Sequence, residues 1–116
     1  MDYFPNAKDA LDHLKKNAEE IFLIISDMNM PKMNGMEFKK AIDRDNYLRQ
    51  KSIPFIFASS APNRTEVLEA YQYRVQGFFK KPDTAEEQAK MLEKIIQYWI
   101  SCIHPTKDDI VTENEE

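Results

Sequence analysis

The sequence predicts an α/β protein in which parallel strands alternate with helices. Three apolar runs, at residues 21–26, 54–59 and 78–80, have the composition of strands. Around them, apolar residues recur at the three- and four-residue spacing of amphipathic helices. Strands that alternate with helices favour a parallel sheet with right-handed crossovers. The chain has 116 residues, 42% of them hydrophobic, which is enough for one domain with a modest core.

Four helices are expected, and each begins at a residue suited to cap it. The capping residues are Asn6, Asn34, Asn63 and Thr84, each three positions before an acidic residue. The expected helices cover residues 7–18, Asn34 to about Arg44, 64–74 and 84–102. Thr84 with Glu87 makes the best capping box, and Gly77 is expected to end the third helix and open the last strand. The polar stretch 45–52 is expected to be a connection.

The rest of the chain is expected to be organised around residues 21–35, a strand at 21–26 and the loop that follows it. Five consecutive apolar residues fit a strand covered on both faces, and Asp27 falls where the strand ends. In open parallel sheets, ligands gather at the carboxyl ends of the strands, so an acid there is well placed for chemistry. Taken alone, Asp27 would more often simply cap a turn.

Composition narrows the classes of function. A net charge of -4 argues against general nucleic-acid binding, which needs a clustered basic surface. The single Cys102 cannot form an internal disulfide, and the sequence contains no signal-peptide pattern or membrane span. A cytoplasmic location and a protein partner are therefore expected.

Three motifs together carry a family resemblance. Residues 26–35, Ser-Asp-Met-Asn-Met-Pro-Lys-Met-Asn-Gly, resemble the phosphoacceptor loop of the response-regulator receiver domain. Residues 54–61 resemble its fourth strand with a switch hydroxyl, and residues 77–82 resemble its fifth strand with a Lys-Pro end. The resemblance runs from about Asn6 to about Ile103. It implies a flavodoxin-like, doubly wound parallel sheet.

The resemblance implies that Asp27 accepts a phosphoryl group and that Lys81 supplies a fixed positive charge beside it. A carboxylate can take up a phosphoryl group only if charge repulsion is relieved. Lys81 would pair with Asp27 at rest and with a phosphate oxygen afterwards. In this family the bond before Pro82 is cis, which would turn Lys81 inward, and Pro82 borders the phosphate pocket.

The remaining site residues also follow from the resemblance. Ser59 matches the hydroxyl that moves to the phosphoryl oxygen, and Ser60 matches a small residue of the phosphate pocket. Phe78 matches the switch aromatic, although a plain core role is nearly as plausible. Mg²⁺ is the expected cofactor, held by the Asp27 carboxylate and the backbone carbonyl of Asn29, which also borders the pocket. Its other ligands would come from an acidic pair that the chain as written lacks.

The chain is expected to be an N-terminally incomplete receiver domain. Such domains open with a strand, an acidic pair, a helix and a second strand, and none of these precedes Asn6. Either the sequence is a shortened piece, with residues 1–4 left from the second strand or its loop, or the molecule begins here. The expected division is a receiver domain over 1–104 and an acidic tail over 105–116 that does not fold alone.

The function expected from the resemblance is that of a phosphoacceptor switch, not an enzyme. A histidine kinase or phosphotransfer protein would phosphorylate Asp27, and helices 64–74 and 84–102 would then bind a downstream protein or a second copy. The expected output surface comprises Tyr71, Tyr73, Phe78, Gln97 and Trp99. The alternative is a pseudo-receiver that binds partners without phosphorylation. A phosphohydrolase is a third reading, for which the sequence offers no general acid.

Overall fold

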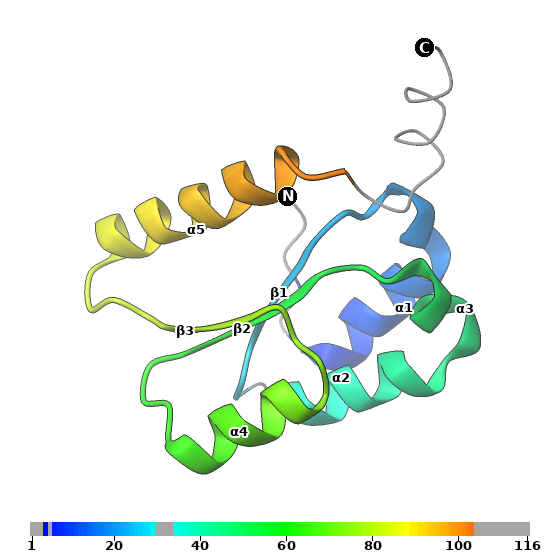
Figure 1. Ribbon diagram of the computed structural model, residues 1–116, viewed down its shortest axis with the longest axis horizontal. Helices are drawn as coiled ribbons and strands as arrows, with labels where there is room; N and C mark the ends of the chain where they lie inside the picture. The colour runs from blue at the N-terminus through cyan, green and yellow to red at the C-terminus, as the bar shows by residue number, and fades with distance from the viewer. Residues whose placement is uncertain (1–3, 5, 30–33, 104–116) are drawn as a thin grey trace.

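Three parallel strands form one sheet, with helices on both faces (Figure 1). The computed structural model describes residues 4, 6–29 and 34–103; the segments 1–3 and 105–116 of the sequence expectations lie outside this part. The elements are α1 (Ala7–Asn17), the 3-10 turn η1 (Ala18–Glu20), β1 (Ile24–Asp27), α2 (Gly35–Arg44), α3 (Asn46–Lys51), β2 (Phe55–Ser59), α4 (Arg64–Gln72), β3 (Gly77–Lys80) and α5 (Ala85–Ile100). None of the described helices has the length and apolar character needed to cross a membrane.

The strand order is β1-β2-β3, so β2 lies in the middle. Ile24 of β1 pairs with Phe55, and Phe57 pairs with Phe78 of β3. All five residues of β2 are buried, whereas Ile24 and Ile25 are only half-buried. The expectation that the strand before Asp27 is covered on both faces is therefore wrong. Among the described residues β1 is an edge strand of the sheet.

Aromatic rings fill the core beneath β2. Phe55 and Phe57 are among the most deeply buried side chains, and their ring centroids lie 4.9 Å apart. Phe38 of α2 packs on Phe55 at 5.6 Å. Burying an aromatic side chain of this size contributes about 1.5–3 kcal/mol, so these rings hold α2 firmly against the sheet. The carboxyl end of β2 and the start of α2 are thereby fixed relative to each other.

The four predicted helix caps are all present. The side chains of Asn6, Asn34, Asn63 and Thr84 each accept a hydrogen bond from the backbone N–H three residues on. The complete capping box is at α4, where the Glu66 carboxylate also accepts from the Asn63 N–H at 3.4 Å. At α5 only the Thr84 half of the box forms, so its ranking as the best box is wrong.

Residues 45–52 were expected to connect two elements but contain a helix, α3. The Asp45 carboxylate caps it by accepting from the Leu48 N–H at 3.0 Å. Leu48 is fully buried, which ties this short helix to the core. The helix ends at Ser52, whose φ of 52° is left-handed. Six residues give too little periodicity to reveal a helix, and tertiary burial of Leu48 decides the conformation.

Helix α4 ends earlier than its sequence predicts. It stops at Gln72, and Arg74, with a φ of 61°, turns the chain before Gly77 is reached. Gly77 therefore opens β3 as predicted but does not end the helix. Gln76 holds the entry to β3, because its N–H donates to the Phe55 carbonyl at 2.9 Å and its side-chain oxygen accepts from the Phe55 N–H at 2.7 Å.

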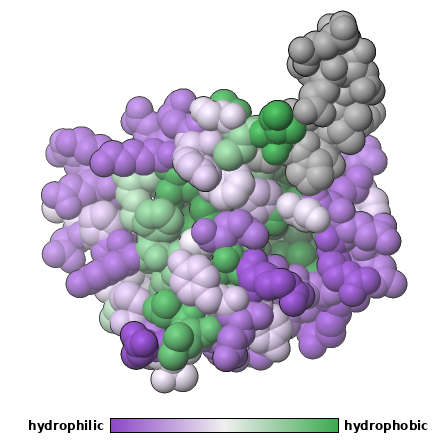
Figure 2. Space-filling view, in the orientation of Figure 1, coloured by the Kyte–Doolittle hydropathy of each residue, from purple (hydrophilic) through white to green (hydrophobic). Residues whose placement is uncertain are grey.

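Helix α5 lies on the opposite face of the sheet from α2 and α4 (Figure 1). It ends at Ile100, two residues before its predicted end, and of its apolar stripe only Ile95 is buried. Tyr98, Ile100 and Ile103 are exposed. Apolar surface is visible beside α5 and over α4 between charged groups (Figure 2). The stripe thus sets the helical conformation of α5 without burying it fully.

Candidate phosphoacceptor site

The three residues predicted to carry the chemistry come together at one edge of the sheet. Asp27 is the last residue of β1, Ser59 is the last residue of β2, and Lys81 directly follows β3. Because the strands are parallel, their carboxyl ends lie side by side. This edge is where open α/β sheets bind ligands.

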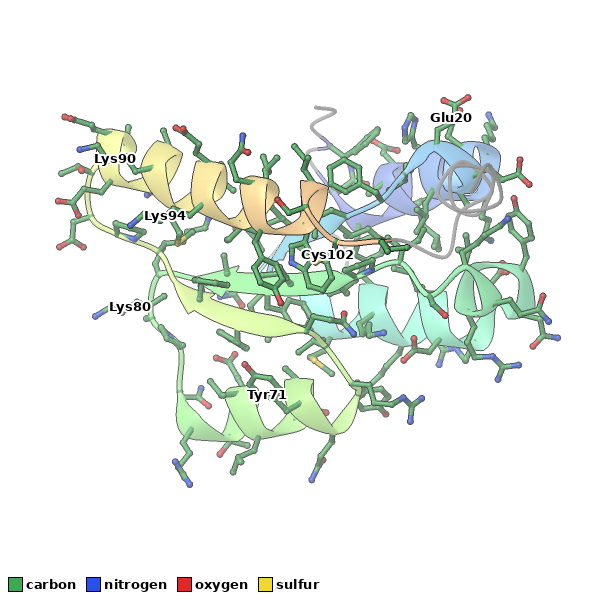
Figure 3. The ribbon with its side chains drawn as sticks, turned by 45° about the horizontal axis from the view of Figure 1, so that its top comes forward. Glu20, Tyr71, Lys80, Lys90, Lys94 and Cys102 are labelled. Carbon is green, nitrogen blue, oxygen red and sulfur yellow. The ribbon has the colours of Figure 1, made fainter. Side chains whose placement is uncertain are left out.

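Asp27 and Lys81 form an ion pair. The Lys81 Nζ lies 2.5 Å from the Asp27 Oδ1, with the Lys81 side chain 27% exposed and the Asp27 side chain 48% exposed. The Lys81 N–H donates to the Ser59 carbonyl at 2.8 Å, which anchors the lysine backbone to β2. The adjacent Lys80 points outward from the end of β3 (Figure 3). Lys81, and not Lys80, is therefore the lysine that pairs with Asp27. The Asp27 carboxylate stays open to solvent.

Ser59 is placed beside this pair but is engaged in a turn. Its side chain is almost fully buried, and its hydroxyl oxygen accepts from the Ala61 N–H at 3.3 Å. Ser60, the predicted pocket residue, is exposed in the segment leading to α4. The chain between β2 and α4 therefore starts at the site edge.

The position of Phe78 fits both roles that the sequence predicts for it, a switch aromatic and a plain core aromatic. It is half-buried, and its ring centroid lies 5.8 Å from that of Phe57 at an interplanar angle of 48°. One side of the ring therefore belongs to the core and the other reaches the surface.

The predicted cis bond before Pro82 is wrong, because no peptide bond between described residues is cis. Lys81 reaches Asp27 all the same. Its direction is set by the hydrogen bond of its N–H to the Ser59 carbonyl and by the alternation of side chains along the strand. The Pro82 carbonyl accepts from the Gln88 side chain at 3.0 Å, which ties the loop to α5.

Gly35 has a structural role at the site that the sequence analysis did not assign. Its N–H donates to the Met28 carbonyl at 2.6 Å. A Cβ placed on Gly35 would lie 2.6 Å from the Asp27 carbonyl oxygen and 2.7 Å from the Phe57 ring. The sequence does contain a signal for this role, because a glycine directly follows the capping Asn34. Glycine is favoured where two backbone segments approach closely.

The described residues supply only part of the oxygen ligands that a Mg²⁺ ion needs. Mg²⁺ prefers six oxygen ligands in an octahedron, usually including one or two carboxylates. Asp27 offers one carboxylate, which is paired with Lys81, and Asn29 lies two residues further on in an exposed position. Across residues 4, 6–29 and 34–103, no group of three or more His, Cys, Asp or Glu side chains could hold a metal.

The predicted output surface is partly exposed. Tyr71 and Gln97 are exposed, whereas Tyr73 and Trp99 are half-buried. The Lys40 Nζ of α2 lies 5.2 Å from the centroid of the Tyr73 ring. Tyr73 therefore contributes to the contact between α2 and α4 more than to an open surface.

Comparison with known proteins identifies the family of the chain. The sequence model of the response regulator receiver domain matches residues 1–94. The chain is 34% identical over 88 residues to the chemotaxis protein CheY-3 of Vibrio cholerae, covering 76% of this chain and 65% of the relative. It is 32% identical over 74 residues to the chemotaxis protein CheY of Pseudomonas aeruginosa, covering 64% of this chain and 58% of the relative. The chain thus spans less than two thirds of these relatives.

Solved structures give the same fold. The phosphorylated cyanobacterial phytochrome response regulator RcpA superposes with a TM-score of 0.78 at 24% identity, covering 89% of this chain and 76% of that one. The Mn(2+)-bound form of the response regulator Rcp1 gives 0.75 at 22% identity, with coverages of 89% and 77%. At such identities the likeness establishes the flavodoxin-like fold alone. Together with the match of the family model over residues 1–94, it shows that this chain belongs to the response regulator receiver domain family.

Proposed function

We propose that the chain is a phosphoacceptor module of a two-component phosphorelay and that Asp27 is the residue phosphorylated. The observation that carries the proposal is the ion pair of Asp27 and Lys81 at the carboxyl edge of the sheet, 2.5 Å between Nζ and Oδ1. The donor would be a phosphohistidine of a histidine kinase or of a phosphotransfer protein. The family membership and the chemotaxis relatives support this class of reaction.

In the proposed reaction, an oxygen of the Asp27 carboxylate forms the new bond to phosphorus. The bond between phosphorus and the donor's imidazole nitrogen breaks, and the electron pair of that bond stays on the nitrogen. Phosphoryl transfer depends mainly on positioning and on stabilisation of negative charge. The Lys81 ammonium starts on the carboxylate and is close enough to move to a phosphoryl oxygen. It therefore keeps an anionic partner throughout the reaction.

The signal would leave through Ser59 and the helix that follows it. If the Ser59 hydroxyl donates to a phosphoryl oxygen and its oxygen moves away from the Ala61 N–H, residues 60–63 would shift and carry the start of α4 with them. The half-buried Phe78 ring would repack in response. The changed surface of α4 and α5 would then alter affinity for a downstream protein or a second copy, by about 1–3 kcal/mol.

The test is phosphorylation of the chain by acetyl phosphate, run in parallel with and without MgCl₂ and read by intact mass. The expected result is one phosphoryl group on the wild type and none on Asp27→Asn. A matched control is Asp83→Asn, because Asp83 is an exposed acid in the loop just after Pro82. Equal phosphorylation of Asp27→Asn and wild type would contradict the assignment.

A phosphorylation-independent binding module is the second candidate. It is favoured because no group of three or more His, Cys, Asp or Glu side chains in the described part of the chain could hold a metal, and Lys81 is the cation that the structure places at Asp27. This candidate predicts no phosphorylation under either condition, and a partner that binds wild type and Asp27→Asn with equal affinity. Phosphorylation of the wild type would exclude it.

A further inference from the structure

One of the two glycines in the sequence directly follows an asparagine, at Asn34 and Gly35. An asparagine before glycine can lose ammonia, because the next backbone nitrogen can attack its side-chain carbonyl carbon. Glycine favours this attack, since it has no side chain to crowd the nitrogen and its backbone is conformationally permissive. Asn34 is exposed, so water reaches it for the hydrolysis that follows. These features make Asn34 a candidate for deamidation.

Deamidation joins the Gly35 nitrogen to the Asn34 Cγ. The nitrogen loses its proton to base and forms the new bond to carbon. The bond between Cγ and the amide nitrogen breaks, and that nitrogen leaves with the electron pair and takes up a proton from water to give ammonia. Water then opens the cyclic imide at either of its two carbonyl carbons. One product has aspartate at position 34; the other has isoaspartate, in which the main chain runs through the former side chain.

Three contacts of the folded chain oppose this reaction. The Gly35 N–H donates to the Met28 carbonyl at 2.6 Å, so the attacking nitrogen is already engaged. The Asn34 Oδ1 accepts from the Glu37 N–H at 2.8 Å, which holds the side chain in place as the cap of α2. A Cβ on Gly35 would meet the Asp27 carbonyl oxygen at 2.6 Å, so the Gly35 backbone has little room to move. The first turn of α2 must therefore open before the imide ring can close.

Ring closure also needs a rotation of the backbone at Asn34. Its ψ is 167°, an extended value typical of a capping residue. The Cγ reaches the Gly35 nitrogen only when ψ turns toward the value that makes the five-membered ring planar, and this rotation pulls Gly35 off the Met28 carbonyl. Local openings of this kind have free energies between zero and that of global unfolding. We infer that Asn34 is a deamidation site whose rate is set by local opening of the first turn of α2.

The two products affect α2 differently. Aspartate keeps a side-chain oxygen that caps the helix, and its negative charge is favourable at a helix N-terminus. Isoaspartate adds one methylene group to the main chain between positions 34 and 35, so the cap and the close contact of Gly35 with Asp27 cannot both be kept. The isoaspartate form is therefore expected to unfold at a lower urea concentration than the aspartate form. The inference goes beyond the proposed function and does not depend on it, because no step involves phosphorylation.

The test is incubation of the unphosphorylated chain at mildly alkaline pH, either folded in buffer or unfolded in guanidinium chloride. Peptide mass spectrometry measures deamidation at each asparagine. Asn34 is expected to react at least about tenfold faster in the unfolded chain, which corresponds to an opening free energy of at least about 1.4 kcal/mol. Asn63 is the internal control, because it caps α4 in the same way at 2.8 Å but precedes Arg64, whose side chain crowds the nitrogen. Equal rates for Asn34 in the folded and unfolded chains, or for Asn34 and Asn63 in the unfolded chain, would overturn the inference.

Two core variants locate the opening, and both leave Asn34 and its neighbours intact. Phe38→Leu loosens α2, because the Phe38 ring packs on Phe55 with the centroids 5.6 Å apart, and it should speed deamidation of the folded chain at least about threefold. Ile95→Val loosens α5 on the opposite face of the sheet and should leave the rate as in wild type. Urea unfolding measures the global stability of each variant. Acceleration in both variants in proportion to their loss of global stability would mean that Asn34 reacts only through global unfolding, and would overturn the inference.

Discussion

Gly35 lies against the backbone of Asp27 so closely that a side chain has no room there. A Cβ on Gly35 would meet the Asp27 carbonyl oxygen at 2.6 Å, and this is backbone that cannot rotate away. The same glycine donates its N–H to the Met28 carbonyl at 2.6 Å. The start of α2 is thereby held directly on the end of β1, which carries the candidate phosphoacceptor.

Gly35→Ala is expected to destabilise the protein by about 1–3 kcal/mol, the usual cost of forcing an extra methyl group into a packed site. The measurement is urea unfolding followed by circular dichroism. Gly77→Ala is the matched control. Its nearest atom would be a Phe79 ring carbon at 3.3 Å, which belongs to a side chain that can shift. If Gly77→Ala lowered the free energy of unfolding as much as Gly35→Ala, the close approach of Gly35 to the Asp27 backbone would be contradicted.

Lys81→Met is expected to change stability by less than about 1 kcal/mol, because the pair with Asp27 is partly exposed and screened by water. It should, however, remove the response of α4 to phosphorylation, since the phosphoryl group loses its fixed cation. Methyl and amide chemical shifts before and after acetyl phosphate measure that response. Lys80→Met serves as the control, because Lys80 points away from the site. Loss of the response in both variants would show that it depends on the net charge of the protein and not on the position of Lys81.

Ser59→Ala should still accept the phosphoryl group but should no longer transmit it to α4. The variant loses one hydrogen bond, to the Ala61 N–H, which costs about 0.5–1.5 kcal/mol of stability. Phosphorylation is read by mass and the response by the amide signals of residues 60–66. Ser60→Ala, at the exposed neighbouring position, should behave as wild type. A full response in Ser59→Ala would assign the coupling to another group.

Lys39 and Asp43 form an ion pair on the face of α2 that packs against the sheet. The Lys39 Nζ lies 2.8 Å from the Asp43 Oδ1 and 5.6 Å from the centroid of the Phe55 ring. The second oxygen of Asp43 is buried and has no hydrogen-bond partner within the described residues. The sequence pattern predicted an apolar stripe on α2 and gave no sign that a lysine would lie within it.

Removing Lys39 alone should therefore cost more than removing both charges. Lys39→Met is expected to destabilise by about 1–3 kcal/mol, because it leaves the Asp43 carboxylate, which is 19% exposed, without its counter-charge, and Lys39→Met with Asp43→Leu by much less. Urea unfolding of the full double-mutant cycle measures the coupling. The exposed pair of Lys90 and Glu86 on α5, 3.6 Å apart at the same spacing, is the comparison and should show a coupling of about 0.3–0.5 kcal/mol. Equal couplings would mean that burial of the first pair has no energetic effect.

Local signals in the sequence determined most of the secondary structure and the identity of the candidate site. Asparagine or threonine three residues before an acid marked the start of each of the four predicted helices, because a cap depends only on residues within one turn. The three apolar runs marked the strands in their correct order. The resemblance of residues 26–35, 54–61 and 77–82 to one family then named Asp27, Ser59 and Lys81 together.

Tertiary structure decided what local patterns could not. The half-burial of β1, the helix at Asn46–Lys51 and the early end of α4 depend on which neighbours each segment meets. The same is true of the direction of Lys81, which is set by its hydrogen bond to Ser59 on the neighbouring strand. Whether an apolar run becomes a central or an edge strand depends on pairing between segments far apart in the chain. Sequence therefore determined which residues could form the site, and packing of the parallel strands determined that Asp27 and Lys81 meet.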